Sequence, residues 1–284
     1  MTELVLDYRV PATDIAEYAT LFYYFYTDLP VFEDTERADH AQMRFRLDGG
    51  AAEYRFPDGN LQRPSPVHIL GPTNGAWHVR AEGPVQVVGW GFTAAGWATM
   101  LNRDASSVLN RMLDAEAVLG PRIGEALAAL QRASDTDQMV AIASALVRHL
   151  CKDVSQETVR FAHLVDGWLE DSSSPDLGDL IVATGLSRRQ IERKCNVMYG
   201  APPKLLARKF RALRAAVSLR GRDLTFDEAV GQGFYDQSHL IREVKQFTGL
   251  TPKQIRDRPT ALAEITVAER IKLKGQVPTR ISQT

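Results

Sequence analysis

Apolar residues recur at helical spacing in the stretch DQSHLIREVKQFTG near the C-terminus. Leu240, Val244 and Phe247 fall on one helix face, while the opposite face is polar and largely basic. Asp236 stands at the N-cap position of this helix, and Gly249 stands where the helix would end. The pattern predicts a helix that packs by a narrow apolar stripe and leaves its opposite face free.

The same arrangement occurs about 48 residues earlier, in the stretch GLSRRQIERKCNVMY. Ile191, Cys195 and Met198 form the apolar stripe, and Ser187 stands at the N-cap position. A short helix, a turn and a second helix with one free polar face make up a helix-turn-helix unit, whose second helix enters the major groove of DNA. For either helix taken alone, a polar face that only meets solvent is the alternative interpretation.

A long helix is predicted between the first unit (residues 178–199) and the second unit (residues 225–248). In residues 204–220, KLLARKFRALRAAVSLR, apolar and basic residues alternate at helical spacing. A rigid connecting helix would fix the separation of two reading helices, which is about 34 Å when they enter successive turns of one groove. Residues 156–171 also have helical spacing, and SSSP ends them, so they are predicted as the first helix of the same domain.

The charge of the chain is divided unevenly, although its net value is −1. Residues 186–258 contain 16 lysines and arginines and 7 acidic residues, a net charge of +9, so the remainder carries −10. A basic segment joined to an acidic body is typical of a part that binds a polyanion and a partner part that does not. The acidic part could compete with phosphates for the basic part at low salt.

Together these residues resemble the DNA-binding domain of the AraC/XylS family of bacterial transcription regulators. The pattern GLSRRQIERKC…YGAPPKLLARKFRALRAA…GFYDQSHLIREVKQFTGLTPKQIR carries the resemblance over residues 155–258. The resemblance implies seven helices with two helix-turn-helix units, both placed in the major groove of one half-site. It also implies that the N-terminal half senses a signal, dimerises, or does both.

The resemblance places the DNA contacts on the free faces of the two reading helices. These residues are Arg188, Arg189, Glu192, Arg193, Asn196, Gln237, Ser238, His239, Ile241, Arg242 and Lys245. Arginine suits guanine, asparagine and glutamine suit adenine, and the apolar Ile241 suits a thymine methyl group. A contact to phosphate alone is the alternative at each position, because such contacts are half or more of a protein–DNA interface.

This chain departs from the usual family pattern at several core positions. Smaller residues replace the family's usual Phe or Tyr at Cys195, Leu206, Val244 and Ile255. Glu228 stands where an aliphatic residue is usual, so we expect one of two arrangements. Either Glu228 lies at an edge, or the short helix of residues 225–231 is rotated so that Phe226 and Val230 supply its apolar face. The departures predict a smaller core, particularly around the second unit.

The N-terminal half has strand patterns followed by helix patterns. Residues 41–92 contain short alternating runs, and Asp48-Gly49-Gly50 marks a hairpin turn, so a small β-barrel or sandwich is predicted. Residues 93–153 are predicted to be helical, including the run ASSVLNRML. The apolar face of residues 135–150 would pack internally or pair with a second subunit, and the resemblance favours a dimer.

Effector contacts are predicted only from aromatic and polar side chains near strand ends. The candidates are Trp77, Arg80, Trp90, Phe92 and Trp97. A buried aromatic residue more often belongs to a hydrophobic core than to a ligand site. His68 and His78 lie on neighbouring predicted strands, but they lack a third ligand at suitable spacing, so no metal site and no cofactor are predicted.

Motifs of common enzymes do not occur in this sequence. It has no P-loop, nucleophile elbow, metalloprotease motif or dinucleotide fingerprint, so no catalytic residue and no enzymatic activity are predicted. Two cysteines, no signal peptide pattern and no long apolar run favour the reducing cytoplasm of a bacterium and no membrane.

These observations predict an α+β protein of two domains. Residues 1–154 form an effector-sensing or dimerisation domain, residues 155–258 form an all-α DNA-binding domain, and residues 259–284 form a tail with one extra helix and a loose end. The predicted function is sequence-specific regulation of transcription on double-stranded DNA, controlled by a small molecule or a regulatory protein. RNA polymerase, if the protein activates, and a second copy of the chain are further candidate partners. The alternative is a small-molecule-binding β-barrel protein whose helical half mediates protein contacts.

Overall fold

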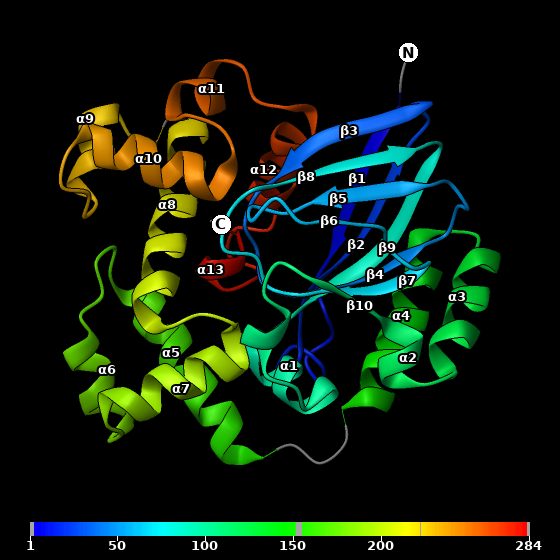
Figure 1. Ribbon diagram of the computed structural model, residues 1–284, viewed down its shortest axis with the longest axis horizontal. Coiled ribbons are helices and arrows are strands. Elements are labelled where there is room, and N and C mark those ends of the chain that lie inside the picture. The colour runs from blue at the N-terminus through cyan, green and yellow to red at the C-terminus, as the bar shows by residue number, and fades with distance from the viewer. Residues whose placement is uncertain (1–2, 152–154, 222, 283–284) are drawn as a thin grey trace.

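The computed structural model describes residues 3–151, 155–221 and 223–282. A β-sandwich with helices on one side is joined to a body of helices, and the last helices of the chain return to the sandwich (Figure 1). The two sheets face each other without closing into a barrel. The predicted class of fold, strands and helices followed by an all-α domain, is therefore confirmed, and the β-rich part is a sandwich.

Both sheets of the sandwich are antiparallel. The larger one contains, in spatial order, β1 (Leu4–Arg9), β2 (Ala19–Thr27), β9 (Val85–Phe92), β4 (Gln42–Arg46), β7 (Val67–Leu70) and β10 (Met112–Asp114). The smaller one contains β3 (Val31–Glu36), β8 (Trp77–Glu82), β5 (Ala52–Arg55) and β6 (Leu61–Gln62). Strand β8 alternates strictly between buried and exposed residues, as expected for a strand with one solvated face. Strands β1 to β3 precede the region in which the sequence predicted strands.

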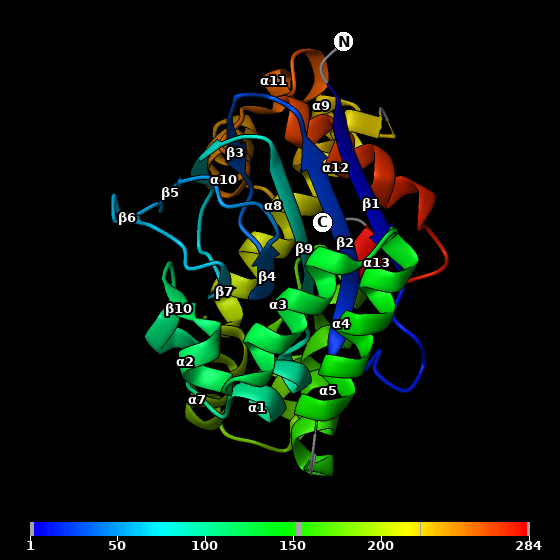
Figure 2. The same cartoon turned by 90° about the vertical axis from the view of Figure 1, so that its right-hand side faces the viewer.

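Helices cover the outer face of the larger sheet (Figure 2). They are α1 (Ala94–Leu101), α2 (Ala115–Leu119), α3 (Arg122–Arg132) and α4 (Thr136–Leu150). Met139, Ala143 and Val147 of α4 are buried in the same core as Trp90 and Phe22 of the sheet. The apolar face of residues 135–150 therefore packs internally, which leaves it unavailable to a second subunit.

The predicted helix ASSVLNRML is wrong. Ala105–Val108 form a short 3-10 helix, η1, and Met112 begins strand β10. Asn110 has a left-handed backbone (φ 55°), and its side chain donates to Asn74 Oδ1 at 2.9 Å while its own Oδ1 accepts from the Asn74 N–H. A helix cannot continue through this backbone conformation, and the tertiary contact with Asn74 favours it over the local helical pattern.

The C-terminal body consists of short helices packed around one long helix. They are α5 (Gln156–Asp171), α6 (Leu177–Thr184), α7 (Arg188–Tyr199), α8 (Pro203–Gly221), α9 (Phe226–Gly231), α10 (Gln237–Thr248) and α11 (Pro252–Asp257). The predicted caps are present: Ser187 and Gln190 form a capping box, and the Asp236 side chain accepts from the His239 N–H. Glu228 lies exposed at the start of α9, where it forms a capping box with Thr225, which agrees with the edge position of the two alternatives.

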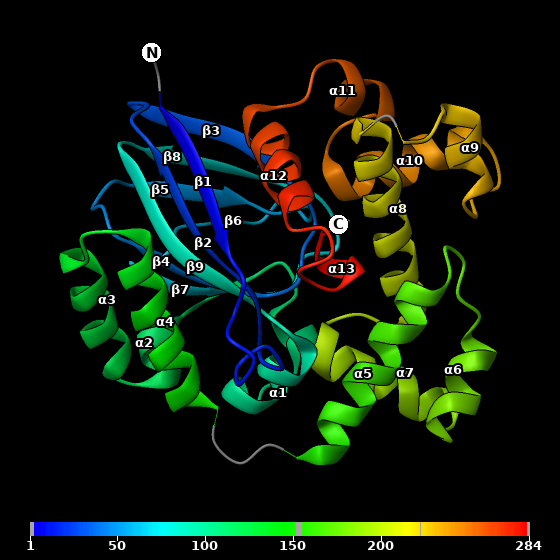
Figure 3. The same ribbon diagram turned by 180° about the vertical axis from the view of Figure 1, so that it is seen from behind.

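The tail of the chain returns to the sandwich instead of ending loosely. Its extra helix, α12 (Ala261–Lys272), packs against β1 and β3, and α13 (Thr279–Ser282) contacts α5 (Figure 3). Leu262 and Ile265 of α12 pack on the core between the two sheets. The expectation of an extra helix is confirmed, whereas the expectation of a loose end is wrong for the described residues up to 282.

Gly249 ends α10 with φ +77°, and a Cβ atom there would lie 2.5 Å from Thr35 Cγ2 on strand β3. We expect Gly249→Ala to lower the free energy of unfolding by about 1–3 kcal/mol, because it combines a left-handed backbone penalty with a clash against a short side chain. Gly231→Ala, at a helical glycine with open space, should change it by less than about 1 kcal/mol. Urea denaturation of the two variants tests the difference, and equal stabilities would contradict it.

Candidate nucleic-acid interface and effector cavity

Two helices with free polar faces lie at opposite ends of α8. Helices α7 and α10 both point their N-terminal ends away from the sandwich (Figure 1). The apolar stripe of α7, which consists of Ile191, Cys195 and Met198, is buried. The corresponding stripe of α10 is buried on α8 and α9, as the sequence predicted.

The residues predicted to contact DNA lie on the remaining surface of these helices. On α7 the exposed or half-buried residues are Arg188, Arg189, Glu192, Arg193 and Asn196. On α10 they are Gln237, Ser238, His239, Ile241, Arg242 and Lys245. Each set of predicted contacts therefore lies on the free polar face of a single helix, as a helix that reads DNA requires.

Several of these side chains already have partners. Arg188 forms an ion pair with Glu192 at 2.9 Å, and the His239 ring accepts from the backbone N–H of Tyr235 at 3.1 Å. By contrast, Arg189, Arg193 and Arg242 are exposed and have no ion-pair partner among the described residues. These three guanidinium groups are therefore available as donors on the two helices.

A buried ion pair that the sequence analysis missed attaches α10 to α8. The Glu243 carboxylate, with 5% of its side chain exposed, lies 2.6 Å from Arg208 Nη2 and 3.8 Å from Arg211 Nη2. The Arg211 guanidinium also lies 5.0 Å from the centre of the Phe234 ring. Glu243 could have been recognised from its spacing, because it falls between Leu240 and Val244 on the buried side of the helix. Two of the basic residues of α8 are therefore part of the packing of the second unit.

The sandwich contacts both reading helices. The N–H groups of Ala38 and Ala76 donate to the carbonyl oxygens of Phe247 at 2.6 Å and Gln246 at 2.9 Å, at the C-terminal end of α10. At α7, Asp104 and Ser106 of the η1 segment border the same shallow depression as Arg189, Arg193 and Asn196. An acidic group of the N-terminal half thus lies beside the basic face of the first unit.

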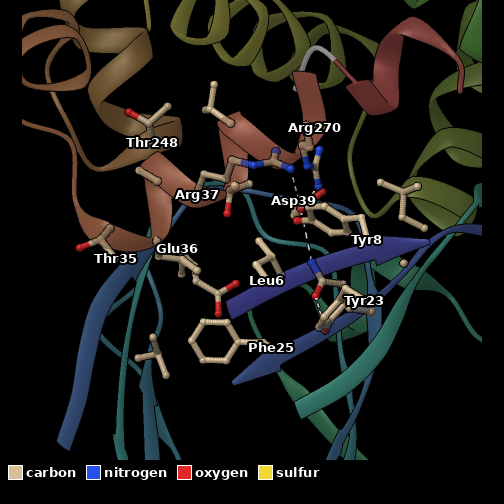
Figure 4. A pocket seen from close by; sticks show the side chains of 18 of the residues that line it. Leu6, Tyr8, Tyr23, Phe25, Thr35, Glu36, Arg37, Asp39, Thr248 and Arg270 are labelled. Carbon is tan, nitrogen blue, oxygen red and sulfur yellow. Dashed lines mark hydrogen bonds and ion pairs between the residues drawn. The ribbon is translucent and has the colours of Figure 1, made fainter. Parts of the chain in front are cut away.

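A cavity of about 160 Å³ lies between the two sheets and is closed by helices of the C-terminal body (Figure 4). Its wall is mainly apolar: Leu6, Phe25, Phe32, Val79 and Val87 come from strands, and Leu213, Val217, Leu262 and Val267 come from α8 and α12. Cavities with apolar walls and a few converging polar groups are the usual form of small-molecule sites. This cavity is therefore the candidate effector site.

Polar side chains form a connected network on one wall of the cavity. The Tyr23 hydroxyl donates to Gln42 Oε1 at 3.0 Å, and Gln42 Nε2 donates to the Asp39 carboxylate at 3.3 Å. Arg37 donates to the same carboxylate at 2.9 Å. Burial by itself would raise the pKa of Asp39, but Arg37, His40 and Arg270 together hold that pKa well below its usual range. Asp39 is therefore ionised at neutral pH.

The residues predicted to contact an effector do not line this cavity. Trp77 packs between Tyr54 and Phe56 in the core between the sheets. Trp90, Phe92 and Trp97 belong to the core under the helices, and Arg80 is exposed on β8. Their role in binding an effector stays a prediction, and Phe92 and Trp97 line a separate cavity of about 110 Å³. The size of an aromatic side chain suits a core as well as a ligand site, so the sequence alone does not distinguish the two. Arg44 and Arg46, both buried on β4, are the signal that reasoning from sequence overlooked.

The histidines considered for metal binding lie in different sheets. His68 is buried on β7, where burial and the neighbouring Arg44 and Arg46 lower its pKa to about 3, and His78 is exposed on β8. Among the described residues no three His, Cys, Asp or Glu side chains are grouped to hold a metal ion. Nor does any described helix have the length and apolar character needed to cross a membrane.

Comparison with known proteins supports the interpretation of the C-terminal helices as a helix-turn-helix domain. Residues 180–258 match the model of a family described as a helix-turn-helix domain. The F1 operon positive regulatory protein of Yersinia pestis is 38% identical over 81 residues, which span 28% of this chain and 27% of the length of that relative. The sequence match covers only the part of the chain that contains the two units.

Two solved structures match this chain at low sequence identity. A crystal structure of ToxT from Vibrio cholerae is 11% identical with a TM-score of 0.46, over 84% of this chain and 98% of that one. The AraC-like transcriptional activator CuxR is 11% identical with a TM-score of 0.32, over 67% of this chain and 79% of that one.

The first prediction from this site concerns the buried ion pair. Glu243→Ala should lower the free energy of unfolding by about 2–3 kcal/mol, because it leaves Arg211 buried without its carboxylate while Arg208 can partly reach water. Glu192→Ala, which breaks only the exposed pair with Arg188, should cost less than about 0.5 kcal/mol. Thermal or chemical unfolding measures both, and a loss below 1 kcal/mol for Glu243→Ala would contradict the structural role of the pair.

The second prediction concerns Asp104 beside α7. Asp104→Asn should raise the affinity of the full chain for DNA about two- to fivefold at low salt, because it removes a negative charge next to the face that carries Arg189 and Arg193. Asparagine can still cap η1 through its side-chain oxygen, so the fold should persist. Asp137→Asn, on α4, is the charge-matched control. Equal DNA affinities of the two variants at every salt concentration would argue against an effect of Asp104.

Proposed function

We propose that this chain, whose residues 180–258 form a helix-turn-helix domain of the AraC/XylS type, is a sequence-specific DNA-binding regulator of transcription. The single observation that supports this best is the repeated packing of α7 and α10. Each helix buries a narrow apolar stripe and leaves a polar face free, and both are attached to the same helix α8. Two reading helices on one rigid connector suit two neighbouring segments of the major groove.

In this proposal, residues 155–258 bind DNA and residues 1–154 carry the sensor. Arg189 and Arg193 contact guanine or phosphate, Asn196 and Gln237 contact adenine or phosphate, and Ile241 contacts a thymine methyl group. Arg188, Glu192, Ser238, His239, Arg242 and Lys245 complete the surface. The tail is part of the sensor as well, because α12 closes the cavity between the sheets.

The effector in this proposal is a small molecule bound in the cavity between the sheets. Both the sandwich and the C-terminal helices line that cavity, so an occupant contacts the sensor and the DNA-binding part together. A ligand that prefers one arrangement of the two parts shifts the population toward it. A second copy on an adjacent half-site and, for an activator, RNA polymerase are the macromolecular partners that such a regulator requires.

The rival function, a small-molecule-binding protein with helices for protein contacts, has less support. It requires no repeat of the unit, and it provides no reason for the exposed guanidinium groups of Arg193 and Arg242 on matching faces. Selection of random duplex DNA with the full-length protein at near-physiological salt separates the two functions. We expect an enriched motif with two blocks about ten base pairs apart, whereas the absence of any enriched motif would favour the rival.

Single substitutions then test the reading residues. Arg193→Ala and Arg242→Ala should each cost about 1–3 kcal/mol of binding free energy on the selected site, and less on unrelated DNA, if the side chains contact bases. Arg132→Ala, an exposed arginine on α3, serves as the control and should leave binding unchanged. Fluorescence anisotropy with both duplexes measures the losses. Equal losses on the two duplexes would show that the arginines contact phosphate only.

A further inference from the structure

A short loop of the helical body reaches from the first helix-turn-helix unit to the second. Residues 172–176 connect α5 to α6 and extend toward the turn that precedes α10 (Figure 1). A Cβ atom on Gly233 in that turn would lie 3.0 Å from Ser174 Cβ and 3.5 Å from the Ser173 carbonyl oxygen, so the loop and the turn pack directly against each other. The two units therefore touch each other in addition to sharing α8.

Hydrogen bonds within the loop hold it in one shape. The buried Trp168 ring donates through Nε1 to the Asp176 carbonyl oxygen at 2.6 Å, which ties the end of the loop to α5. The Ser174 N–H donates to Ser172 Oγ at 3.0 Å, and the ring of Pro175 fixes one backbone angle. A loop restrained in this way acts as a spacer between the units.

Two arginines of α8 hold the two sides of this contact. Arg214 Nη2 donates to the carbonyl oxygens of Leu169 and Glu170 at 3.4 Å each, in the last turn of α5, where a positive charge is favourable. Arg211, three residues earlier on α8, packs under the turn, with its Cδ atom 3.4 Å from the position of a Cβ atom on Gly233. Helix α8 therefore holds both the start of the loop and the turn that the loop contacts.

The contact fixes the end of α10 that the sandwich does not reach. Ala38 and Ala76 of the sandwich donate to carbonyl oxygens at the C-terminal end of this helix. Helix α10 has 12 residues and is about 18 Å long. A tilt of about 10° around its C-terminal end would move its N-terminal end by about 3 Å, which is close to the rise of one base pair, about 3.4 Å. The loop contact opposes this tilt because it holds the turn directly before α10.

We propose that the contact between residues 172–176 and the turn at Gly233 sets the separation of the two DNA segments that the units accept, with Ser174 and Gly233 as its positioning residues. The inference rests on the proposed function and adds to it the element that determines the spacing of the two motif blocks. One base pair inserted between the blocks displaces the second block by about 3.4 Å and rotates it by about 35°. A second unit held at both ends cannot follow this displacement.

The first test measures the spacing preference of the full-length chain. The duplexes carry the two blocks of the selected motif at the selected separation, or with one base pair inserted or removed between them. The unmodified chain should bind the two altered duplexes at least about tenfold more weakly. Gly233→Asn, which places an amide side chain against Ser174 and Arg211, should prefer another separation or lower the preference below about threefold. An unchanged preference in a folded Gly233→Asn chain would overturn the proposal.

Two controls separate the contact from backbone strain. Gly185 stands at the corresponding turn of the first unit, with φ +67° and open space around it, and asparagine tolerates a left-handed backbone. Gly185→Asn should therefore keep the preference of the unmodified chain. Ser174→Gly, added to the Gly233→Asn chain, removes the Cβ atom at the contact and should restore the preference. Without this rescue, or with the same loss for Gly185→Asn, the contact is not what sets the spacing.

The second test does not depend on DNA. Nitroxide labels on Val182→Cys of α6 and Tyr235→Cys of the turn before α10 use two strongly exposed positions, in a chain that also carries Cys151→Ser. Electron–electron double resonance should give one narrow distance distribution, which Gly233→Asn shifts or broadens and Ser174→Gly restores. The same distribution in all three chains would contradict a positioning role of the loop.

The two tests separate this inference from the proposed function. An enriched DNA motif with the same spacing preference in every variant leaves DNA reading intact and removes the role of the loop. A changed distance between the units without any enriched motif keeps the loop as the element that positions α10 and removes the DNA-binding function.

Discussion

The rest of this structure depends on the packing of α8, which contacts the first helix-turn-helix unit, the second unit and the cavity of the sandwich. Leu206 contributes to the core of the first unit, and Leu213 and Ala216 contribute to the core of the second. Leu213 and Ala216 also line the cavity, and the Lys209 ammonium group donates to the Asp39 carbonyl oxygen at 3.1 Å. Burial lowers the pKa of Lys209 to about 8. Because α8 packs against both units and also lines the cavity, a shift of α8 would change the positions of α7 and α10 and the shape of the cavity together.

The arginines of the C-terminal body divide into two physical roles. Arg193 and Arg242 are exposed on the reading faces, where a flexible charged side chain can reach bases or phosphates. Arg208 and Arg211 instead compensate the buried Glu243. The net positive charge of residues 186–258 thus overestimates the charge available to DNA, because some of these arginines form internal ion pairs.

The structure also changes the meaning of the two halves of the chain. In the proposed function the sensor is not confined to the N-terminal residues, since α8 and α12 provide walls of the candidate effector cavity. Conversely, the sandwich touches the reading helices through Ala38, Ala76 and the η1 segment. Sites that share residues in this way are coupled by the contacts themselves, so a ligand that favours one packing of the two halves acts on DNA binding directly.

What the sequence determined by itself was the local structure of the C-terminal half. Apolar spacing and capping residues such as Ser187 and Asp236 act within a few residues of the chain, so the approximate bounds of α7, α8 and α10 and the buried stripes of α7 and α10 could be derived from it. Only the tertiary structure decided which side chains meet across long separations: Glu243 with Arg208, Asn110 with Asn74, and Arg270 with Asp39. Residues far apart in the sequence form the cavity wall together, and the local spacing of apolar residues does not show which of them meet. For this reason the two helices with free polar faces could be predicted, whereas the residues that line the cavity could not.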